Sequence, residues 1–573
     1  MKHTTIFATI FAIAMLFCIS ACGKEDILSD GTYTGKTVGH NAEITIEVTI
    51  KNGSVSNAQI ISQKESPGVG LPAAEQIVRA FVEQGNTTGI DVVSGATITS
   101  RAVLSALNKA LVAAHKKKNS SAYKDTECDI VIIGAGGAGL VAATEATCRG
   151  AKVIVLEKMG IVGGNTNYST GGINASYTKE QKRLGIVDST DVFFDDIMAG
   201  GYYLNDPQLV RTLVDNSAAM VEWLQSDLIG ADLSDVGMFG GATNKRIHRP
   251  KGGGAIGVHL VPRLHKAALV HGADIRLNNK AIDILSDNGK ACGVRVAAAD
   301  TEYTISAKAV IIATGGFGAN IDMVSIYQPS LSNFGTTNHK GATGDAFQMV
   351  EKFNADITQM TQIQIHPTVV PNTNIMITEA VRGNGAILVN RDGKRFIDEL
   401  GNRDIVSAAI LTQPGRTAFL VFDQGVRDSL NAIEDYVKQN LLTKGSSITE
   451  LAGKLHIPAI TLEKTVASYN ESVKKGVDEA FKRSPASMER PLNIAPYYAV
   501  ECGPAIHHTM GGLKINTKAE VLNKNGKPIP ALYAAGEVTG GLHGGNRLGG
   551  NAVADICIFG KIAADSALAY IGK

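Results

Sequence analysis

The strongest fold signal in this chain lies at residues 128–157, CDIVIIGAGGAGLVAATEATCRGAKVIVLE. An apolar run predicts a buried strand over 128–133, and a glycine-rich turn follows it directly. The next residues predict a helix over 140–149 and a second buried strand over 152–156. A strand, a glycine turn, a helix and a strand in this order are typical of an α/β fold of the Rossmann type, with a parallel sheet.

The glycine turn in this stretch suits a phosphate group. Gly134, Gly136 and Gly139 permit a tight turn and a close backbone approach, and the helix that follows offers N–H groups and partial positive charge to a pyrophosphate. Glu157 ends the second strand, where a carboxylate can accept hydrogen bonds from ribose hydroxyls. A purely structural glycine turn is the alternative, but the flanking strand and helix favour a dinucleotide site.

Two further apolar runs extend the predicted sheet toward the C-terminus. A strand over 309–313 precedes Thr-Gly-Gly, and a strand over 532–535 precedes Gly-Glu. The chain between them predicts an inserted α+β cap with a helical stretch over 405–480. The predicted bounds are 127–358 with 503–573 for the sheet domain, and 359–502 for the cap.

A small α+β unit is predicted before the sheet domain, over 27–114. Apolar and polar residues alternate in 42–50, and Asn52-Gly53 and a second apolar run follow, which indicates a β-hairpin. Apolar residues at helical spacing then predict two helices in the rest of the unit. The expected helices cover 72–84 and 101–114, and a polar linker covers 115–126.

The first 21 residues have the form of an export signal. Lys2 and His3 precede a short apolar run, and the following Ile-Ser-Ala-Cys resembles a bacterial lipobox that ends at Cys22. Lipidation of Cys22 would hold the protein at a membrane, on the periplasmic or outer cell-surface face. Ordinary cleavage after Ala21 and an uncleaved anchor are the alternatives.

Length and composition narrow the possible partners. The chain has 573 residues, which predicts several domains, and its net charge of +1 gives no reason to expect nucleic acid. The seven cysteines include no CxxC and no CxxCH pair. We therefore predict no c-type haem attachment, no disulfide framework and no metal site.

Residues 366–404 gather the chemical groups of a proton-transferring site. Arginines, a histidine and a carboxylate stand in segments that glycines interrupt, where turns can aim side chains into a cleft. Such a set suits the binding of a small anion, whereas the plain alternative is a solvated, charged surface. The candidate residues are His366, Thr378, Glu379, Arg382 and Arg403.

This stretch resembles the active-site segment of the soluble fumarate reductase flavoprotein family. HHTMGG at 507–512 and GGNRLGGN at 544–551 resemble the other half of that site. The resemblance implies that fumarate is held by two sets of residues, one for each carboxylate. The first set is His507 and Arg547, and the second is His366 and Thr378. It also implies that Arg403 delivers a proton, which Glu379 and Arg382 relay from solvent.

The same resemblance implies FAD rather than NAD as the nucleotide. Asn165 takes the place at which related respiratory complex II flavoproteins carry a histidine for covalent attachment, so we expect noncovalent FAD. His508 is expected to lie against the flavin. The implied FAD contacts are Gly134, Gly136, Gly139, Glu157, Asn165, Thr166, Gly171, Gly172, Gly316, His508, Glu537 and Asn551.

A second motif, DVVSGAT at 91–97, resembles the signature of domains that carry FMN on a threonine. In those domains an FMN transferase forms the phosphoester bond, and Thr97 is the implied acceptor. Thr99 is the second choice. A helix-capping turn is the alternative, and both can hold because Thr99 or Ser100 could cap the helix while Thr97 is modified.

Together these features predict an exported, lipid-anchored fumarate reductase of the anaerobic type. An external donor, such as a cytochrome or a membrane flavoprotein or quinol system, would reduce the covalent FMN, and FAD N5 would then give hydride to fumarate. The chain lacks the CxxCH haem domain of the flavocytochrome members and has the FMN domain in its place. The alternatives are a reductase of another 2-enoate (urocanate, acrylate, methacrylate or cinnamate), an electron-carrier lipoprotein and an FAD oxidase.

Overall fold

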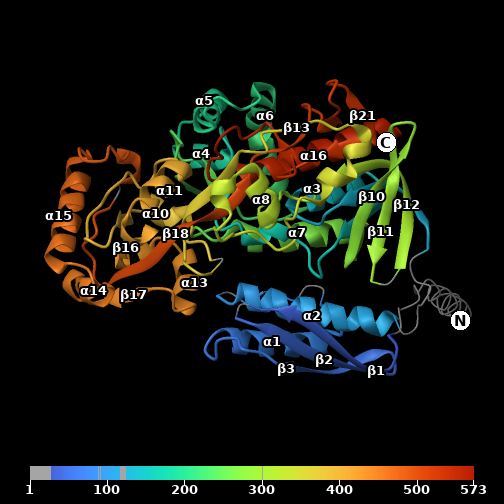
Figure 1. The fold of residues 1–573 in the computed structure, drawn as a ribbon, viewed down its shortest axis with the longest axis horizontal. Helices are drawn as coiled ribbons and strands as arrows, with labels where there is room; N and C mark the ends of the chain where they lie inside the picture. The colour runs from blue at the N-terminus through green and yellow to red at the C-terminus, as the bar shows by residue number, and fades with distance from the viewer. Residues whose placement is uncertain are drawn as a thin grey trace, which may run out of the picture. The chain divides into compact units, whose positions relative to one another are not determined.

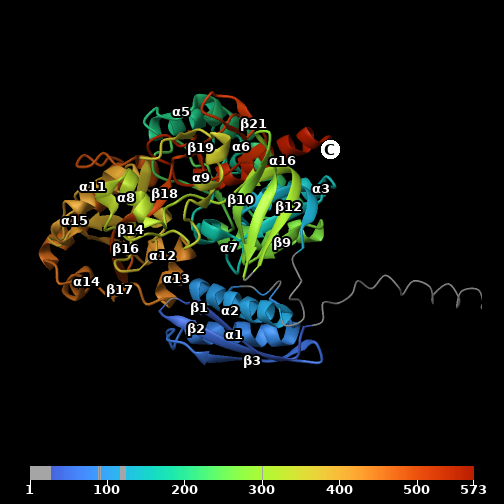
Figure 2. The ribbon, with the colours of Figure 1, turned by 45° about the vertical axis from the view of Figure 1, so that its right-hand side comes forward.

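The computed structural model describes residues 28–39, 41–87, 90, 92–93, 95–116, 124–299, 301–373, 375–488 and 490–573. This part of the chain folds as two compact units (Figure 1, Figure 2). The first contains the elements between Gly31 and Lys116, and the second contains those between Thr126 and Ile571. The predicted export signal and Cys22 lie outside the described residues.

The first unit contains a three-stranded antiparallel sheet, β1 (Gly31–Val38), β2 (Glu43–Lys51) and β3 (Ser54–Ser62). The predicted hairpin is confirmed, because β2 and β3 pair across a turn in which Asn52 and Gly53 have φ values of 53° and 74°. Positive φ at both central positions suits the twist of a two-residue hairpin. The alternating apolar face of β2 is buried, as the pattern predicts: Ile44, Ile46, Val48 and Ile50.

Two helices complete this unit, α1 (Gly70–Gln84) and α2 (Thr97–Lys116). Both were expected, and each begins a few residues earlier than its apolar periodicity indicates. β1 was not expected. Its Gly35 permits close packing, because a Cβ atom there would collide with the backbone carbonyl of Ala106 in α2. The sheet and helix can therefore approach closely at this point.

One eight-stranded sheet organises the second unit. Its parallel part is β12 (Thr301–Ile312), β4 (Thr126–Ile133), β5 (Val153–Glu157) and β9 (Asp274–Leu277). β21 (Pro528–Ala534) also pairs in parallel with β12. The antiparallel additions are β10 (Asn279–Asp287), β11 (Lys290–Ala298) and β20 (Glu520–Leu522). The central strands are buried, as expected for a sheet with both faces covered.

Helix α3 (Gly137–Cys148) begins directly after the glycine turn that ends β4. It packs against α7 (Ile256–Val270) and α16 (Asn551–Ile571) (Figure 1). Nearly every residue of α3 is buried, which explains its run of small side chains. The predicted FAD-type α/β fold with a Rossmann-like βαβ start is confirmed, together with the small α+β domain before it.

A second hydrophobic core lies around a five-stranded sheet between residues 363 and 509. Its strands are β14 (Ile363–Val369), β18 (Tyr497–Thr509), β16 (Ala418–Asp423), β15 (Ile387–Val389) and β17 (Thr443–Gly445). Its main helices are α10 (Glu379–Gly383), α11 (Arg403–Leu411), α13 (Ala432–Lys438), α14 (Ile448–Leu455) and α15 (Ala459–Lys475).

The predicted helical stretch over 405–480 is wrong at two strands, β17 and β16. The first five residues of β16, AFLVF, are all apolar, so its sequence shows neither the helical nor the alternating period by which helix and strand are told apart. β18 runs through residue 503 and so crosses the predicted boundary of the cap. The bounds 359–502 for the cap stay a prediction.

Further elements complete this second unit. They include α4 (Lys179–Arg183), α5 (Thr190–Gly200), α6 (Pro207–Gln225), α8 (Ile321–Tyr327), α9 (Asp345–Met349), α12 (Gln424–Asp428), β6 (Ile173–Asn174), β7 (Asp235–Gly237), β8 (Ile247–Arg249), β13 (Ile357–Thr358), β19 (Gly512–Lys514) and β22 (Thr539–Gly540). Within the described ranges, none of the helices is long and apolar enough to span a membrane.

Candidate active site

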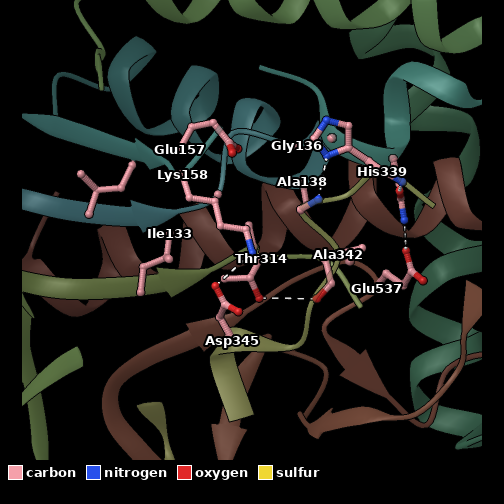
Figure 3. Close-up of a pocket in the computed structure, with 18 of the residues that line it drawn as sticks. Ile133, Gly136, Ala138, Glu157, Lys158, Thr314, His339, Ala342, Asp345 and Glu537 are labelled. Carbon is pink, nitrogen blue, oxygen red and sulfur yellow. Dashed lines mark hydrogen bonds and ion pairs between the residues drawn. The ribbon is translucent and has the colours of Figure 1, made fainter. Parts of the chain in front are cut away.

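A pocket with about 860 Å³ of empty space opens at the carboxyl ends of the parallel strands (Figure 3). Its position at the carboxyl edge of the sheet is where α/β folds bind ligands. Figure 3 shows Lys158 and Asp345 toward one end of the pocket, and His339 and Glu537 toward the other.

Glycines shape the wall of this pocket. Gly164 and Gly315 have positive φ, and a Cβ atom at either position would have no atom within 4 Å. Gly136 stands at the N-cap of α3, where the helix offers its free N–H groups. A wall without side chains beside a helix N-terminus lets the backbone approach a pyrophosphate. The pocket therefore fits a dinucleotide such as FAD.

Glu157 is buried in the lining of the pocket. Its Oε2 accepts a hydrogen bond from the N–H of Ala135 at 3.0 Å, and its Oε1 accepts one from the N–H of Met159 at 2.8 Å. Burial raises the pKa of Glu157 above its usual value, although both N–H groups oppose that shift. Each oxygen keeps a second lone pair, so the carboxylate can still accept from a ribose.

Six of the predicted FAD contacts line the pocket: Gly134, Gly136, Glu157, Asn165, Thr166 and Glu537. The other six lie outside its lining: Gly139, Gly171, Gly172, Gly316, His508 and Asn551. Two of these six serve packing, because a Cβ atom on Gly139 or Gly172 would collide with a backbone carbonyl. Their roles as FAD contacts stay predictions. Lining residues that the sequence did not indicate include Lys158, Thr314, His339 and Asp345.

Asn165 sits in a polar network at this pocket. Its Nδ2 donates to Asn338 Oδ1 at 2.6 Å and to Glu537 Oε2 at 3.1 Å, and its Oδ1 accepts from the N–H of His339 at 2.6 Å. An amide offers no nucleophilic ring nitrogen to the cofactor. The position therefore fits noncovalent FAD.

The residues predicted to move a proton lie together in a second, buried cluster. Glu379 is the first residue of α10 and Arg403 the first residue of α11. Both Nε and Nη2 of Arg403 lie 2.9 Å from Glu379 Oε2, and Nη2 of Arg382 lies 3.8 Å from the same oxygen. The side chain of Arg382 is 0% exposed, so solvent does not reach it in this conformation.

Gln364 joins this cluster to Arg547. Its Oε1 accepts from Arg403 Nη1 at 3.0 Å and from Arg547 Nη2 at 3.1 Å. Its Nε2 donates to Asn546 Oδ1 at 2.6 Å and to the carbonyl of Arg547 at 2.8 Å. Two guanidinium groups thus converge on one oxygen atom. The sequence analysis did not indicate Gln364, because a lone glutamine in a strand carries no motif.

The two substrate histidines also meet here. The rings of His366 and His507 lie 5.1 Å apart. His366 Nδ1 accepts from the N–H of Thr368 at 3.3 Å, and His507 Nδ1 lies 2.7 Å from Thr337 Oγ1. Burial, followed by the charge of Arg403, lowers the pKa of both imidazoles well below its usual value. Both are therefore neutral at physiological pH.

The remaining predicted residues border this cluster. Thr378 caps α10: its side chain accepts from the N–H of Ala380, and its own N–H donates to Tyr436 Oη at 2.8 Å. His508 lies 3.6 Å from Glu537, which lines the FAD pocket. Burial and the charge of Arg547 lower the pKa of His508 well below its usual value.

The cluster concentrates positive charge in a buried place. Burial and the neighbouring Arg403 lower the pKa of Arg547 to about 9. Burial alone would raise the pKa of Glu379, but Arg403, Arg382 and the N–H of Gly240 outweigh it and lower that pKa. His366 Nε2 and Arg547 Nε are buried and have no hydrogen-bond partner among the described residues. Unpartnered donors and excess positive charge together suit an anionic ligand.

The FMN motif lies only partly within the described residues. Asp91, Ser94 and the side chain of Thr97 fall outside them, while the backbone places Thr97 as the first residue of α2. Thr99 and Ser100 therefore stand inside the helix and not at its N-cap. Thr99 is 3% exposed, and its hydroxyl donates to Glu65. In the described part of the chain, no group of His, Cys, Asp or Glu side chains is placed to hold a metal ion.

Comparison with known proteins agrees with the division of the chain into two units. Residues 129–553 match the family described as FAD binding domain, and residues 39–112 match the family described as FMN-binding domain. The chain is 46% identical over 456 residues to the fumarate reductase (cytochrome) of Shewanella frigidimarina, which covers 79% of each protein. It is 41% identical over 532 residues to the NADH:fumarate oxidoreductase of Klebsiella pneumoniae (strain 342), covering 92% of this chain and 57% of that protein.

The structure matches the solved open conformation of a flavocytochrome c3 fumarate reductase with a TM-score of 0.65 and 42% sequence identity. That match covers 80% of this chain and 81% of the other. Fold, pocket and relatives define an FAD-dependent oxidoreductase that acts on CH–CH groups. The chain belongs to the soluble fumarate reductase flavoprotein family and carries an N-terminal FMN-binding domain, so FAD and FMN are its cofactors.

Some relatives have other substrates. The chain is 34% identical over 562 residues to the urocanate reductase of Eggerthella lenta, covering 94% of this chain and 92% of that protein. It is 33% identical over 619 residues to the NADH:acrylate oxidoreductase of Vibrio harveyi, covering 94% of this chain and 61% of that protein. Family membership alone therefore leaves the enoate open.

Proposed function

We propose that this protein reduces fumarate to succinate, with Arg403 as the proton donor. The observation that carries the proposal is the convergence of Arg403 and Arg547 on Gln364 Oε1, at 3.0 and 3.1 Å. A carboxylate oxygen is a stronger acceptor for guanidinium donors than a neutral amide oxygen. A dicarboxylate bound beside Gln364 would relieve the repulsion between the two arginines, which are both buried.

The histidines support a substrate with charge at both ends. His366 Nε2 is buried and lacks a hydrogen-bond partner within the described residues, so it is free to donate to a carboxylate. His507 and Arg547 are available for the other carboxylate. A monocarboxylate would leave one of these donor sets without an acceptor, and a buried donor without a partner is costly.

Bound and reduced, FAD would supply a hydride to one alkene carbon. Arg403 would give a proton to the neighbouring carbon, and Glu379, whose Oε2 lies 2.9 Å from two of its nitrogens, would return one to it. Arg382 Nη2 lies 3.8 Å from the same oxygen, so Arg382 would be the next group in the proposed relay. Positive charge from Arg403 and Arg547 would also stabilise the negative charge that develops on the substrate.

Reduction of another 2-enoate is the second candidate. The acrylate and urocanate reductases among the relatives favour it. The two candidates separate in a steady-state assay that follows oxidation of a reduced dye by the purified holoenzyme with fumarate, acrylate, methacrylate, cinnamate and urocanate. The proposal requires the highest kcat/KM with fumarate. A higher kcat/KM with any of the other four would exclude fumarate as the preferred substrate.

We further propose that electrons enter through FMN bound to Thr97 and that lipid on Cys22 anchors the exported protein to a membrane. The FMN-binding domain match and the SGAT turn support the first statement. The lipobox-like Ile-Ser-Ala-Cys supports the second. An FMN transferase would load the threonine, and an external cytochrome, membrane flavoprotein or quinol system would supply the electrons.

A further inference from the structure

The hydroxyl of Tyr202 contacts both chain neighbours of Arg403. It donates to Asp404 Oδ2 at 2.5 Å and accepts from Asn402 Nδ2 at 3.3 Å. Tyr202 belongs to the loop after α5, whereas Asn402 and Asp404 flank the first residue of α11. One side chain from a distant part of the sequence thus holds the helix turn that carries Arg403.

The backbone at Tyr202 and the N-terminus of α11 both have unfavourable local geometry at this contact. Tyr202 and Tyr203 are consecutive residues with φ values of 58° and 56°, a region that large side chains rarely adopt. Asn402 occupies the N-cap position of α11, yet its side chain makes no capping hydrogen bond and turns to Tyr202 instead. Strained backbone and a missing cap at the same contact indicate a functional constraint.

The same loop also holds the segment that carries Arg547. The carbonyl of Gly201 accepts from the N–H of Gly545 at 2.9 Å, and the carbonyl of Gly200 accepts from Asn546 Nδ2 at 3.1 Å. Asn546 Oδ1 in turn accepts from Gln364, the residue that both arginines contact. Residues 200–204, which are the last residue of α5 and the loop after it, therefore touch the supports of Arg403 and of Arg547.

We infer that Tyr202 is a positioning residue, whose hydroxyl sets the place of Arg403 relative to Arg547 and the bound substrate. The inference rests on the proposed role of Arg403 as proton donor. Misplacement of a proton donor by a fraction of an ångström lowers the rate of proton transfer more than it weakens substrate binding. Loss of the Tyr202 hydroxyl should therefore reduce kcat and leave dicarboxylate binding almost unchanged.

The test compares Tyr202→Phe with Tyr203→Phe in the full-length holoenzyme. Tyr203 is the matched control, because it has the same side chain and backbone conformation but is 73% exposed, against 41% for Tyr202. We expect kcat with fumarate to fall about ten- to a hundred-fold in Tyr202→Phe, while KM and the Kd of malonate change less than about three-fold. Tyr203→Phe should match the wild type. Asp404→Asn, which weakens the same contact, should shift kcat in the same direction.

Two results would overturn the inference. One is a kcat for Tyr202→Phe equal to that of Tyr203→Phe. The other is a fall in kcat that comes with equal losses of malonate affinity and Tm, because that pattern marks general loosening of the fold. Arg403→Ala measured alongside separates the claims. If it keeps wild-type kcat, the proton-donor role and the Tyr202 inference both fall, whereas an inactive Arg403→Ala beside an unaffected Tyr202→Phe overturns only the inference.

Discussion

The backbone N–H of Thr368 donates a hydrogen bond to Nδ1 of His366 at 3.3 Å. Because Nδ1 accepts, the proton of the neutral imidazole must sit on Nε2. That nitrogen is buried and finds no hydrogen-bond acceptor in the described part of the chain. The protein backbone therefore selects the tautomer that can donate to a substrate carboxylate.

His366→Ala should consequently raise KM for fumarate with a smaller effect on kcat. Loss of a hydrogen bond to a charged group costs about 1.5–3 kcal/mol, or roughly ten- to a hundred-fold in kcat/KM. Steady-state kinetics with fumarate measure this, and His271→Ala, at an exposed histidine at the end of α7, is the control. Unchanged fumarate kinetics in His366→Ala, together with faster turnover of urocanate or acrylate by the wild type, would count against a dicarboxylate substrate.

The pKa of Arg547 predicts how ligand binding depends on pH. Burial and Arg403 lower this pKa to about 9, so Arg547 loses its proton as the pH rises through that value. The Kd of malonate should be flat between about pH 7 and 8 and should then rise, toward about ten-fold per pH unit. Because His366 and His507 are neutral throughout this range, they add no further break.

Titration of the flavin absorbance with malonate across this range checks the prediction. Arg547→Gln should bind malonate weakly at every pH and show no break near 9. A wild-type Kd that stays flat to about pH 10 would contradict the prediction. It would mean that Arg547 keeps its proton, and that burial and Arg403 lower its pKa by less than the prediction requires.

Thr97 should carry FMN only when an FMN transferase is present. The intact mass of protein made with and without the transferase should differ by one FMN, and Thr97→Ala should abolish the difference while FAD remains bound. Thr99→Ala is the matched control, because the Thr99 hydroxyl is buried and bonded to Glu65. An FMN adduct that persists in Thr97→Ala and disappears in Thr99→Ala would move the acceptor to Thr99.

Cys22 should be the lipid-bearing N-terminus of the mature protein. Cys22→Ser should block processing or release the protein from the membrane fraction, while Cys148→Ser, at an exposed cysteine in the FAD-binding part, should leave both unchanged. Mass spectrometry of the mature N-terminus measures the modification. A wild-type protein that fractionates as soluble with an unmodified N-terminus would contradict lipidation.

The hairpin of the FMN-binding unit could be predicted because its strand pattern and its turn agree. β2 alternates apolar and polar residues, and Asn52-Gly53 suits the turn. β1 could not be predicted, since its inward positions include Gly31, Gly35 and Thr37, which carry little apolar surface. β16 was missed for the opposite reason. Its first five residues, AFLVF, are all apolar, so the strand shows neither a helical nor an alternating period.

The charged residues of the site could be proposed from the sequence because their motifs match a family. The residues that hold them could not. Gln364 accepts from two arginines, yet the contact with Arg547 exists only in the folded chain. Gly240 contributes a backbone N–H to Glu379, and a backbone group leaves no signal in the sequence. The hydroxyl of Tyr202 contacts Asp404, which lies about two hundred residues further along the chain, so this contact also leaves no signal in the sequence.

The most direct test of the account is Arg403→Ala, measured for turnover and for ligand binding in the same preparation. Arg403 contacts Gln364 and Glu379, while His366, His507 and Arg547 remain to hold a dicarboxylate. We expect kcat with fumarate to fall by at least about 10²–10⁴, the usual contribution of a general acid, while the Kd of malonate changes less than about ten-fold. Arg403→Lys should recover little, because an ammonium cannot reproduce the guanidinium geometry. Substantial turnover in Arg403→Ala, with FAD bound and malonate affinity intact, would contradict the assignment of Arg403 as the proton donor.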